Sequence, residues 1–235
     1  MKAVILAAGM GRRLAAMGWD QPKCLLPCPQ GTLLDNAITS ALTHGVEEIV
    51  IVVGFQQELV VAAASRHDAK LTFVVNEHFA STNTLHSLRL TEEHLRDGFL
   101  LFNGDVWFQS AVLDRLLAYD GSALGIEPKP CGDEEVKVVV DAEDRIRKIG
   151  KKLSPDTCLG EYLGIAKFDA DFAAHFAASL RRLDESIQSS NFFYETALDP
   201  LLEVNPLRAV RLEPSSAIEI DTPDDRQHAL RLWAT

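Results

Sequence analysis

The sequence contains few of the residues that are typical of secreted proteins, of proteins stabilised by a bound metal, or of membrane proteins. Its 235 residues include four cysteines, three methionines and only 7% aromatic residues, and the cysteines are scattered at 24, 28, 131 and 158. Cys24 and Cys28 stand four apart, but no second pair and no histidine cluster completes a zinc site. We therefore expect four free thiols in a reducing compartment.

Long hydrophobic runs and an excess of basic residues are also missing. The apolar run at residues 3–8 is too short for a signal peptide and lacks a cleavage site, and no stretch approaches the length of a transmembrane helix. With 34 acidic and 23 basic residues the net charge is −11, which disfavours binding to a nucleic-acid backbone. We expect a cytoplasmic protein with no membrane or nucleic-acid partner; a few basic residues in one cleft can still bind a small anion.

The first half of the chain shows strands that alternate with helices. Continuous apolar runs that end in glycine or a polar residue predict buried strands, and apolar residues at helical spacing predict the helices. This β-α-β-α-β-α-β order favours a parallel sheet with helices on both faces. The predicted strands are 2–7, 48–53, 71–75 and 99–103, and the predicted helices are 33–44, 56–66 and 83–95.

In the second half of the chain the strict alternation of strands and helices ends, and the pattern predicts hairpins. The whole chain therefore predicts one α/β domain, a Rossmann-like, mostly parallel sheet flanked by helices, with extra antiparallel strands in the second half. The last helix is expected near Thr222, where Pro223 suits the first helical position. The other predicted strands are 122–126, 136–140, 145–150, 162–168, 208–212 and 217–220, and the predicted helices are 170–183 and 193–203.

A glycine-containing loop after the first strand is the strongest chemical signal. Residues 6–14 read LAAGMGRRL, and Pro22-Lys23 follow. Glycines let the backbone approach a triphosphate, and N–H groups of such a loop bind anions. Arg13 can bind phosphate oxygens with the two prongs of its guanidinium, and Lys23 can attract them as a single positive charge. The loop is not a dinucleotide fingerprint, because the third glycine is missing and no helix starts at once, and it is not a Walker loop.

Two acidic segments could complete a magnesium site. Asp105, in Asn103-Gly-Asp-Val, follows the fourth strand at the sheet edge where α/β proteins bind ligands. Glu219 and Asp221 alternate along a late strand and so share one of its faces. Magnesium prefers one or two carboxylates together with substrate phosphates. We expect Asp105 and Asp221 to bind Mg²⁺; the alternatives are that Asp105 starts a turn and that Asp221 caps the last helix.

These signals together resemble the nucleotidyltransferase family that activates sugar 1-phosphates and polar alcohol phosphates. The family's opening motif is a strand, then G-x-G-[ST]-R-[LM], then P-K, which here reads GMGRRL and PK, with Arg12 in place of Ser or Thr. The family's metal-binding aspartate follows a strand, as Asp105 does, and its second ligand lies late in the chain, as Asp221 does. The resemblance runs from residue 2 to about residue 228 and implies the fold of the nucleotide-diphospho-sugar transferases.

The resemblance also implies that residues 1–235 form one nucleotidyltransferase domain whose two halves bind different substrates. Residues 1–120 would form the nucleotide-binding half and residues 121–235 the acceptor-binding half. Lys23 and Arg13 would be catalytic, because they would stabilise charge on the triphosphate. The implied nucleotide-binding residues are Leu6, Ala7, Ala8, Gly9, Gly11, Arg13, Lys23, Asn83 and Gly104.

Three segments resemble the phosphocholine cytidylyltransferase-like branch of the family. They are the STNTLHSL run at 81–88 with Asn76-Glu77 before it, residues 137–151, and FYETA at 193–197. The branch implies CTP and a phosphocholine, aminoethylphosphonate or polyol phosphate acceptor; CTP and phosphocholine are our expectation. The run at 81–88 is also read as a helix that Ser81 or Thr82 caps.

An amine-bearing acceptor would need a pocket of aromatic faces and carboxylates. The resemblance and this requirement together give an acceptor-binding set. Its members are Trp107, Tyr162, Tyr194, Glu161, Glu195, Lys137 and Glu219.

Two other functions stay open from the sequence. The segment Asn103–Trp107 also looks like that of sugar-1-phosphate uridylyl- or guanylyltransferases. A non-catalytic nucleotide-sensing domain is the alternative from another class, although a sensor need not keep Lys23, Asp105 and Asp221. The expected partners are a nucleoside triphosphate and a small phosphorylated acceptor, and the expected assembly is a monomer or a homodimer.

Overall fold

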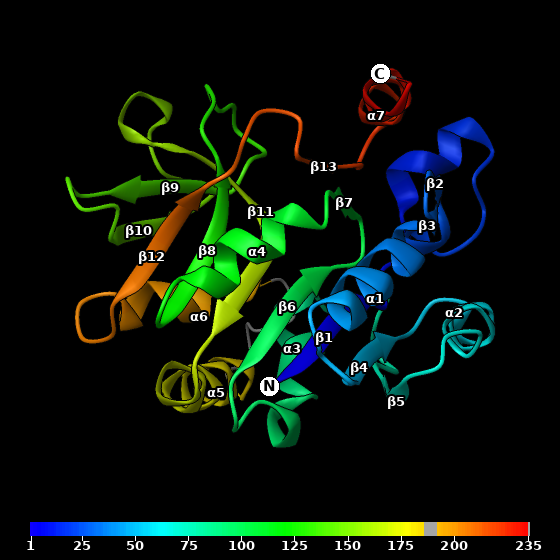
Figure 1. Cartoon of the computed structure of the whole chain (residues 1–235), viewed down its shortest axis with the longest axis horizontal. Coiled ribbons are helices and arrows are strands. Elements are labelled where there is room, and N and C mark those ends of the chain that lie inside the picture. The colour runs from blue at the N-terminus through cyan, green and yellow to red at the C-terminus, as the bar shows by residue number, and fades with distance from the viewer. Residues whose placement is uncertain (186–191, 235) are drawn as a thin grey trace.

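The strand that begins the chain lies in the middle of a mixed sheet (Figure 1). The computed structural model describes residues 1–185 and 192–234. The strands in this part of the chain are β1 (Lys2–Ala7), β2 (Pro27–Cys28), β3 (Gly31–Thr32), β4 (Glu48–Val53), β5 (Lys70–Val75), β6 (Phe99–Asn103), β7 (Val106–Phe108), β8 (Ser122–Glu127), β9 (Lys137–Val140), β10 (Ile146–Gly150), β11 (Gly160–Phe168), β12 (Leu207–Arg211) and β13 (Ala217–Glu219). The helices are α1 (Leu33–Thr43), α2 (Gln57–Ala64), α3 (Thr84–Arg89), α4 (Ala111–Ala118), α5 (Ala170–Asp184), α6 (Glu195–Leu198) and α7 (Pro223–Trp233).

The sheet joins a parallel half to an antiparallel half. Strands β5, β4, β1 and β6 are parallel neighbours in this order. Strand β11 then pairs antiparallel with β6, and both β8 and β9 pair antiparallel with β11. The predicted fold class is therefore confirmed: a mostly parallel first half carries extra antiparallel strands from the second half.

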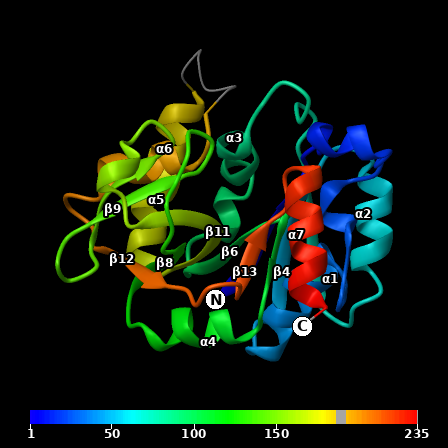
Figure 2. The same cartoon turned by 90° about the horizontal axis from the view of Figure 1, so that it is seen from above.

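Helices cover both faces of the sheet because its central strands are apolar on both sides. Ala3, Ile5 and Ala7 of β1 pack with α1, α2 and α4, whereas Val4 and Leu6 pack with α3, α5 and α6. Figure 2 shows α3, α5 and α6 on one side of the strands and α1 and α4 on the other. A strand buried on both faces reads as a continuous apolar run, which is why β1 was recognisable from the sequence.

Several helices begin at side-chain caps. Thr32 caps α1 and Thr222 caps α7, each in a reciprocal capping box with Asp35 and Asp225 respectively. Asn83, rather than the expected Ser81 or Thr82, caps α3. The hydroxyl of Thr82 instead donates to the carbonyl of His78, at 2.8 Å.

The structure also contains elements that the sequence reading did not include. These are α4, the short strand β7, the β2–β3 hairpin and a 3₁₀ helix at Arg12–Met17 directly after the glycine loop. The expected helix at 83–95 ends at Arg89, and a 3₁₀ turn follows at Glu92–His94. All four cysteines are free thiols, as expected. Within residues 1–185 and 192–234, no helix is long and apolar enough to cross a bilayer.

The register brings three loops to the same edge of the sheet. Leu6 of β1 lies opposite Asn103 of β6, and Ala7 lies opposite Val53 of β4. The segments after β1, β4 and β6 therefore leave the sheet side by side. Gly104 is required here, because a Cβ at this position would approach the carbonyl oxygen of Leu6 to 2.5 Å.

Candidate active site

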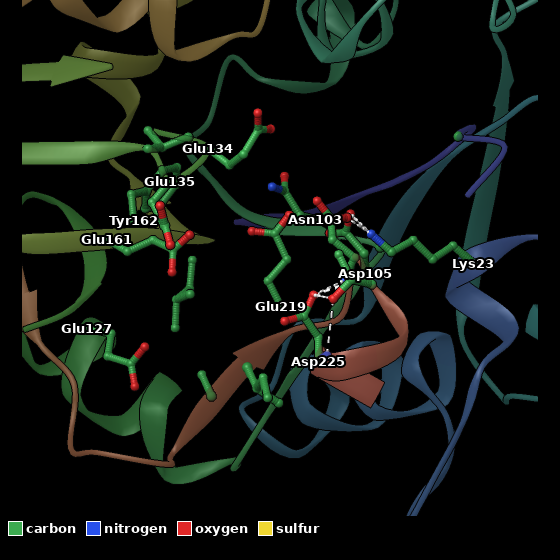
Figure 3. Close-up of a pocket in the computed structure, with 18 of the residues that line it drawn as sticks. Lys23, Asn103, Asp105, Glu127, Glu134, Glu135, Glu161, Tyr162, Glu219 and Asp225 are labelled. Atoms are coloured by element: carbon green, nitrogen blue, oxygen red, sulfur yellow. Dashed lines mark hydrogen bonds and ion pairs between the residues drawn. The ribbon is translucent and has the colours of Figure 1, made fainter. Parts of the chain in front are cut away.

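A cavity of about 810 Å³ opens at this edge of the sheet (Figure 3). Its lining includes most of the glycine loop and, from the predicted nucleotide set, also Lys23, Asn83 and Gly104. Ala8 does not line the cavity; its carbonyl accepts a hydrogen bond from the amide of Phe55, at 3.2 Å. The loop members that line the cavity are Leu6, Ala7, Gly9, Gly11, Arg12 and Arg13.

Gly11 allows the loop backbone to pack against the aliphatic part of the Lys23 side chain. Its φ is +58°, in the left-handed region that favours glycine, and an added Cβ would lie 3.1 Å from Cβ of Lys23. The loop backbone and the aliphatic stem of Lys23 are therefore in direct contact.

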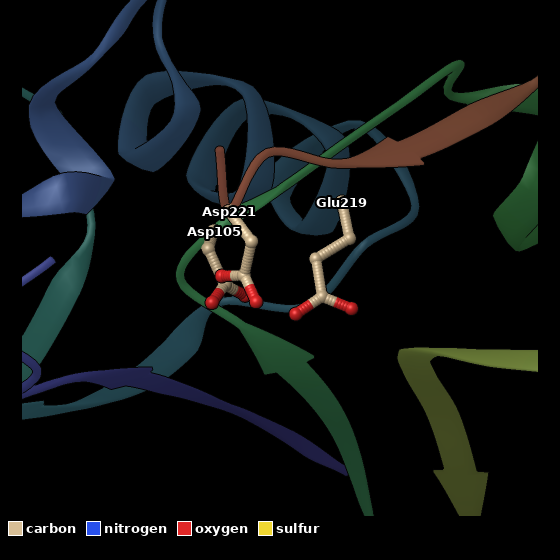
Figure 4. A group of neighbouring side chains, drawn as sticks. All are labelled: Asp105, Glu219 and Asp221. Carbon is tan, nitrogen blue, oxygen red and sulfur yellow. The ribbon is translucent and has the colours of Figure 1, made fainter. Parts of the chain in front are cut away.

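The pairing of β7 with β13 brings the two predicted metal ligands together. Val106 lies opposite Glu219, and the amide of Ile220 donates to the carbonyl of Asp105, at 3.0 Å. Carboxylate oxygens of Asp105, Glu219 and Asp221 lie within 4.8 Å of one another (Figure 4). Glu219 and Asp221 share one face of this segment, as their spacing predicts, and Ile220 between them is buried on the other side.

The cluster suits a hard divalent cation. It offers carboxylate oxygens, the donors that Mg²⁺ prefers, and Oδ1 of Asp105 is buried without a hydrogen-bond partner in the described structure. Burial and the charges of Asp105 and Asp221 raise the pKa of Glu219 well above its usual range. Three carboxylates this close repel one another unless positive charge separates them.

Lys23 supplies positive charge to this cluster. Its Nζ donates to Oδ2 of Asp105, at 2.9 Å, and to Oδ1 of Asp221. Burial alone lowers the pKa of Lys23, but the charges of Asp105 and Asp221 outweigh it and raise the pKa above its ordinary value. Burial likewise raises the pKa of Asp221, yet Lys23 and Arg13 bring it below the usual range.

Arg13 is paired as well. Its Nη2 lies 2.9 Å from Oε2 of Glu134 and its Nη1 lies 3.2 Å from Oδ2 of Asp221. The hydrogen bond to Glu134 and the charge of Asp221 raise the pKa of Arg13. The guanidinium is half exposed, so both contacts can be exchanged for contacts to another anion.

The wall opposite the carboxylate cluster of Asp105, Glu219 and Asp221 is also acidic (Figure 3). Lys129 lies between two of its carboxylates, with Nζ at 2.6 Å from Oε2 of Glu161 and 3.2 Å from Oε2 of Glu127. Burial raises the pKa of Glu161 although Lys129 opposes the effect. Lys129 was not expected from the sequence; the run EPKP at 127–130, charged residues directly after a strand, is the signal that marks it.

Glu195 is a buried acid that lines the cavity. It is only 6% exposed, and its Oε2 has no hydrogen-bond partner in the described structure. Burial raises its pKa to about 7. An unsatisfied buried carboxylate is costly, so it marks a place where a ligand can supply the missing partner.

Three members of the predicted acceptor set lie outside the cavity lining. Trp107 packs against Trp233, because both faces of β7 are covered, and its Nε1 donates to Gln30, at 2.9 Å. Tyr194 is fully buried, and its hydroxyl lies 2.9 Å from that of Tyr162. Lys137 is buried, and its Nζ donates to the backbone carbonyls of Gly132 and Glu135.

Two of these residues support the site rather than line it. Lys137 holds the loop that carries Glu134 and Glu135 into the cavity. Tyr194 braces the hydroxyl of Tyr162, which does line the cavity. The sequence patterns located segments that contribute to the cavity, but the patterns do not reveal which side of a strand or loop faces it.

The glycine loop and the carboxylate cluster lie at the carboxyl ends of the parallel strands, the edge at which α/β proteins bind their ligands. Residues 3–146 match the MobA-like NTP transferase domain. The match covers more than half of the chain, which therefore belongs to this family of nucleotidyltransferases.

Relatives and a solved structure agree with this membership. A CMP-5′-(3-aminopropyl)phosphonate synthase of Streptomyces rubellomurinus is 30% identical over 97% of this chain, which spans 38% of the length of that relative. A CTP:phosphoglutamine cytidylyltransferase of Campylobacter jejuni is 26% identical over 96% of this chain and 97% of its own length. The CTP:phosphocholine cytidylyltransferase structure from Streptococcus pneumoniae superimposes with a TM-score of 0.82 at 22% identity, over 98% of each chain.

Proposed function

We propose that this nucleotidyltransferase joins CMP from CTP to the phosphate or phosphonate of a small acceptor whose head is a primary ammonium, with Mg²⁺ on Asp105 and Asp221. One observation carries the proposal: the cavity combines the glycine loop and the carboxylate cluster with the buried carboxylate of Glu195, whose Oε2 has no hydrogen-bond partner in the described structure.

The nucleotide would occupy the end of the cavity formed by the loop after β1. Backbone groups between Leu6 and Gly11 would read the base, and cytosine differs from uracil by exchanging a donor for an acceptor. A missing partner in a dry pocket costs about 1–3 kcal/mol, or roughly 5- to 150-fold in selectivity. The relatives from Streptomyces and Campylobacter, named for CMP and CTP, support cytosine as the base.

The proposed reaction is an in-line displacement. An acceptor oxygen attacks the α-phosphorus of CTP, a new P–O bond forms, and the bond to the β-phosphate breaks to release pyrophosphate. Lys23 and Arg13 stabilise charge on the triphosphate, and no general base is needed because the acceptor oxyanion is already ionised. Bound Mg²⁺ would neutralise charge between the reacting oxygens.

The acidic wall supports a positively charged acceptor head. Oε2 of Glu195 lacks a hydrogen-bond partner in the described structure, and Glu161 shares Lys129 with Glu127. The carboxylate oxygens of this wall therefore have room for further hydrogen-bond donors. A primary ammonium brings three N–H donors, which match such oxygens.

Aromatic faces, which a trimethylammonium group prefers, are scarce in the cavity. Trp107 and Tyr194 do not line it, and only 2% of Tyr162 is exposed. Phe193 lines it, but Nζ of Lys151 already lies 4.7 Å from the centre of its ring. This composition favours an aminoalkyl phosphate or phosphonate over phosphocholine.

The division into halves is part of the proposal. Residues 1–120 contribute the loop, Lys23 and Asp105 to the nucleotide end, and residues 121–235 contribute the acidic wall with Lys129. Asp221 would cross this division, since it reaches the nucleotide end from the second half.

A substrate panel tests the proposal. CTP, UTP, GTP and dTTP are combined with phosphoethanolamine, 3-aminopropylphosphonate, phosphocholine, glycerol phosphate and glucose 1-phosphate, and pyrophosphate release is measured. We expect CTP with an aminoalkyl acceptor to give the highest kcat/KM. A preference for CTP with phosphocholine would support CTP as the donor and overturn the primary-ammonium acceptor. A preference for UTP or GTP with glucose 1-phosphate would overturn both the donor and the acceptor.

A further inference from the structure

The groups expected to bind phosphate and the groups expected to bind metal contact each other in this structure. The ammonium of Lys23 bridges Asp105 and Asp221, and Nη1 of Arg13 lies 3.2 Å from Oδ2 of Asp221. Two positive side chains therefore neutralise the two aspartates that would receive a divalent cation.

A divalent cation cannot simply add to this arrangement. The Lys23 ammonium lies within hydrogen-bonding distance of both ligands, so an entering cation would meet a like charge inside the cluster. Lys23 has to leave, and its ammonium then needs another anion, because a buried unpaired charge is strongly disfavoured.

The glycine loop offers a place for that anion close to the lysine. The stem of Lys23 packs on Gly11, and the loop and both aspartates line the same cavity. Rotation about the stem would transfer the ammonium from the aspartates to a phosphate held by the loop. Arg13, half exposed beside the loop, can make the same change of partner.

We propose that the ligand of this site is the pair of a divalent cation and a triphosphate, and that Lys23 holds the cation's position in the free protein until the triphosphate takes over its ammonium. The exchange preserves charge balance: the cation takes the aspartates, and the triphosphate takes Lys23 and Arg13. The inference rests on the proposed function in treating the anion as a triphosphate, but it concerns binding and requires no particular base or acceptor.

The test measures metal binding alone. Mn²⁺ is titrated into the metal-free protein without nucleotide, and free Mn²⁺ is followed by electron paramagnetic resonance. We expect Lys23→Met to bind Mn²⁺ at least tenfold more tightly than wild type, and the double variant with Asp105→Asn to lose the gain. The matched control is Lys152→Met, which removes one positive charge from an exposed side chain outside the cavity lining and should leave Mn²⁺ affinity unchanged.

A second measurement uses the wild-type protein and so does not depend on how a variant folds. Thermal melting is followed with Mn²⁺ alone, with tripolyphosphate alone, and with both. We expect the joint rise in Tm to exceed the sum of the separate rises. Equal Mn²⁺ affinity in wild type and Lys23→Met, or purely additive Tm shifts, would overturn the exchange. Neither experiment uses CTP or an acceptor, so the result is separable from failure of the substrate panel.

Discussion

The backbone amide of Ile220 donates a hydrogen bond to the carbonyl of Asp105, at 3.0 Å. This bond continues the antiparallel pairing of β13 with β7 and fixes Asp221 beside Asp105. The carboxylate cluster is thus a consequence of strand pairing, and not of a flexible loop that has to find its position.

Replacing either aspartate with asparagine should abolish turnover. Asp105→Asn and Asp221→Asn each remove an anionic oxygen from the proposed Mg²⁺ site. Pyrophosphate release should fall to background at millimolar Mg²⁺, and calorimetry should show weaker binding of magnesium nucleotide. The matched control is Asp224→Asn, an exposed first-turn residue of α7, which should retain activity. Full activity in Asp221→Asn would reduce the site to one carboxylate.

Removing the ammonium group of Lys23 should lower mainly kcat. Lys23→Ala should lower kcat by roughly 100-fold or more, because the ammonium would meet charge that develops in the transition state. The same change in Lys152, an exposed lysine outside the cavity lining, should leave kcat within about twofold. A circular-dichroism melt checks folding, and near-normal kcat in a folded Lys23→Ala protein would remove Lys23 from the mechanism.

Acceptor binding should depend on the ionisation of Glu195. Burial raises its pKa to about 7, with Lys151 and Asp105 as the charges that act on it and Tyr162 and Tyr194 packed nearby. Above pH 7 the carboxylate is charged and attracts an ammonium, so the acceptor KM should fall as pH rises from 6 to 8.

The acceptor phosphate also titrates near pH 6, and a variant separates the two effects. Glu195→Gln should raise the acceptor KM at pH 8 and flatten the part of the profile near pH 7, with little change in the KM for CTP. Glu93→Gln, an exposed glutamate, is the control. An unchanged profile in Glu195→Gln would disprove the role of Glu195.

A second acidic residue should govern stability at low pH. Asp35 closes the capping box of α1 and lies 2.7 Å from Nε2 of His67. Burial raises the pKa of Asp35, but hydrogen bonds from His67 and Thr32 outweigh burial and hold the pKa below its ordinary value. The folded state therefore binds fewer protons, so this stabilisation is complete above the unfolded pKa and is lost as pH falls below it.

Asp35→Asn should lower the free energy of unfolding by about 1–2 kcal/mol at pH 7, through loss of the cap and its charge-assisted bond. Urea unfolding at pH 7 and pH 3 measures the difference, which should shrink at the lower pH. Asp114→Asn is the control, since Asp114 also pairs with a histidine, His44, but is 71% exposed. Its change should stay within about 0.5 kcal/mol.

The regular part of the fold was predictable because local pattern and tertiary environment agree. Strand β1 is apolar from Ala3 to Ala7 because this part is buried on both faces, and α5 places Phe172, Phe176 and Leu180 on one face at helical spacing. Helix α4 and strand β7 were missed, because no element was predicted between the strand at 99–103 and the strand at 122–126, although α4 buries Val112, Leu113 and Leu116 at helical spacing.

The acceptor end was predictable only in part. Glu161 and Glu195 line the cavity as expected, whereas Trp107 and Tyr194 face other packing partners. The sequence locates a residue in an element, but the direction of its side chain depends on what covers each face of that element.

The sequence by itself determined the chemistry available at this site. The GMGRRL loop, Lys23 and the alternation of Glu219 with Asp221 are local patterns, fixed by residue type and spacing. Tertiary structure alone decided which of these groups are partners. The pairing of β7 with β13 joins segments distant in the chain, and it leaves the Lys23 ammonium between Asp105 and Asp221. Contacts of that kind depend on long-range strand register, which the spacing of residues within one segment does not encode.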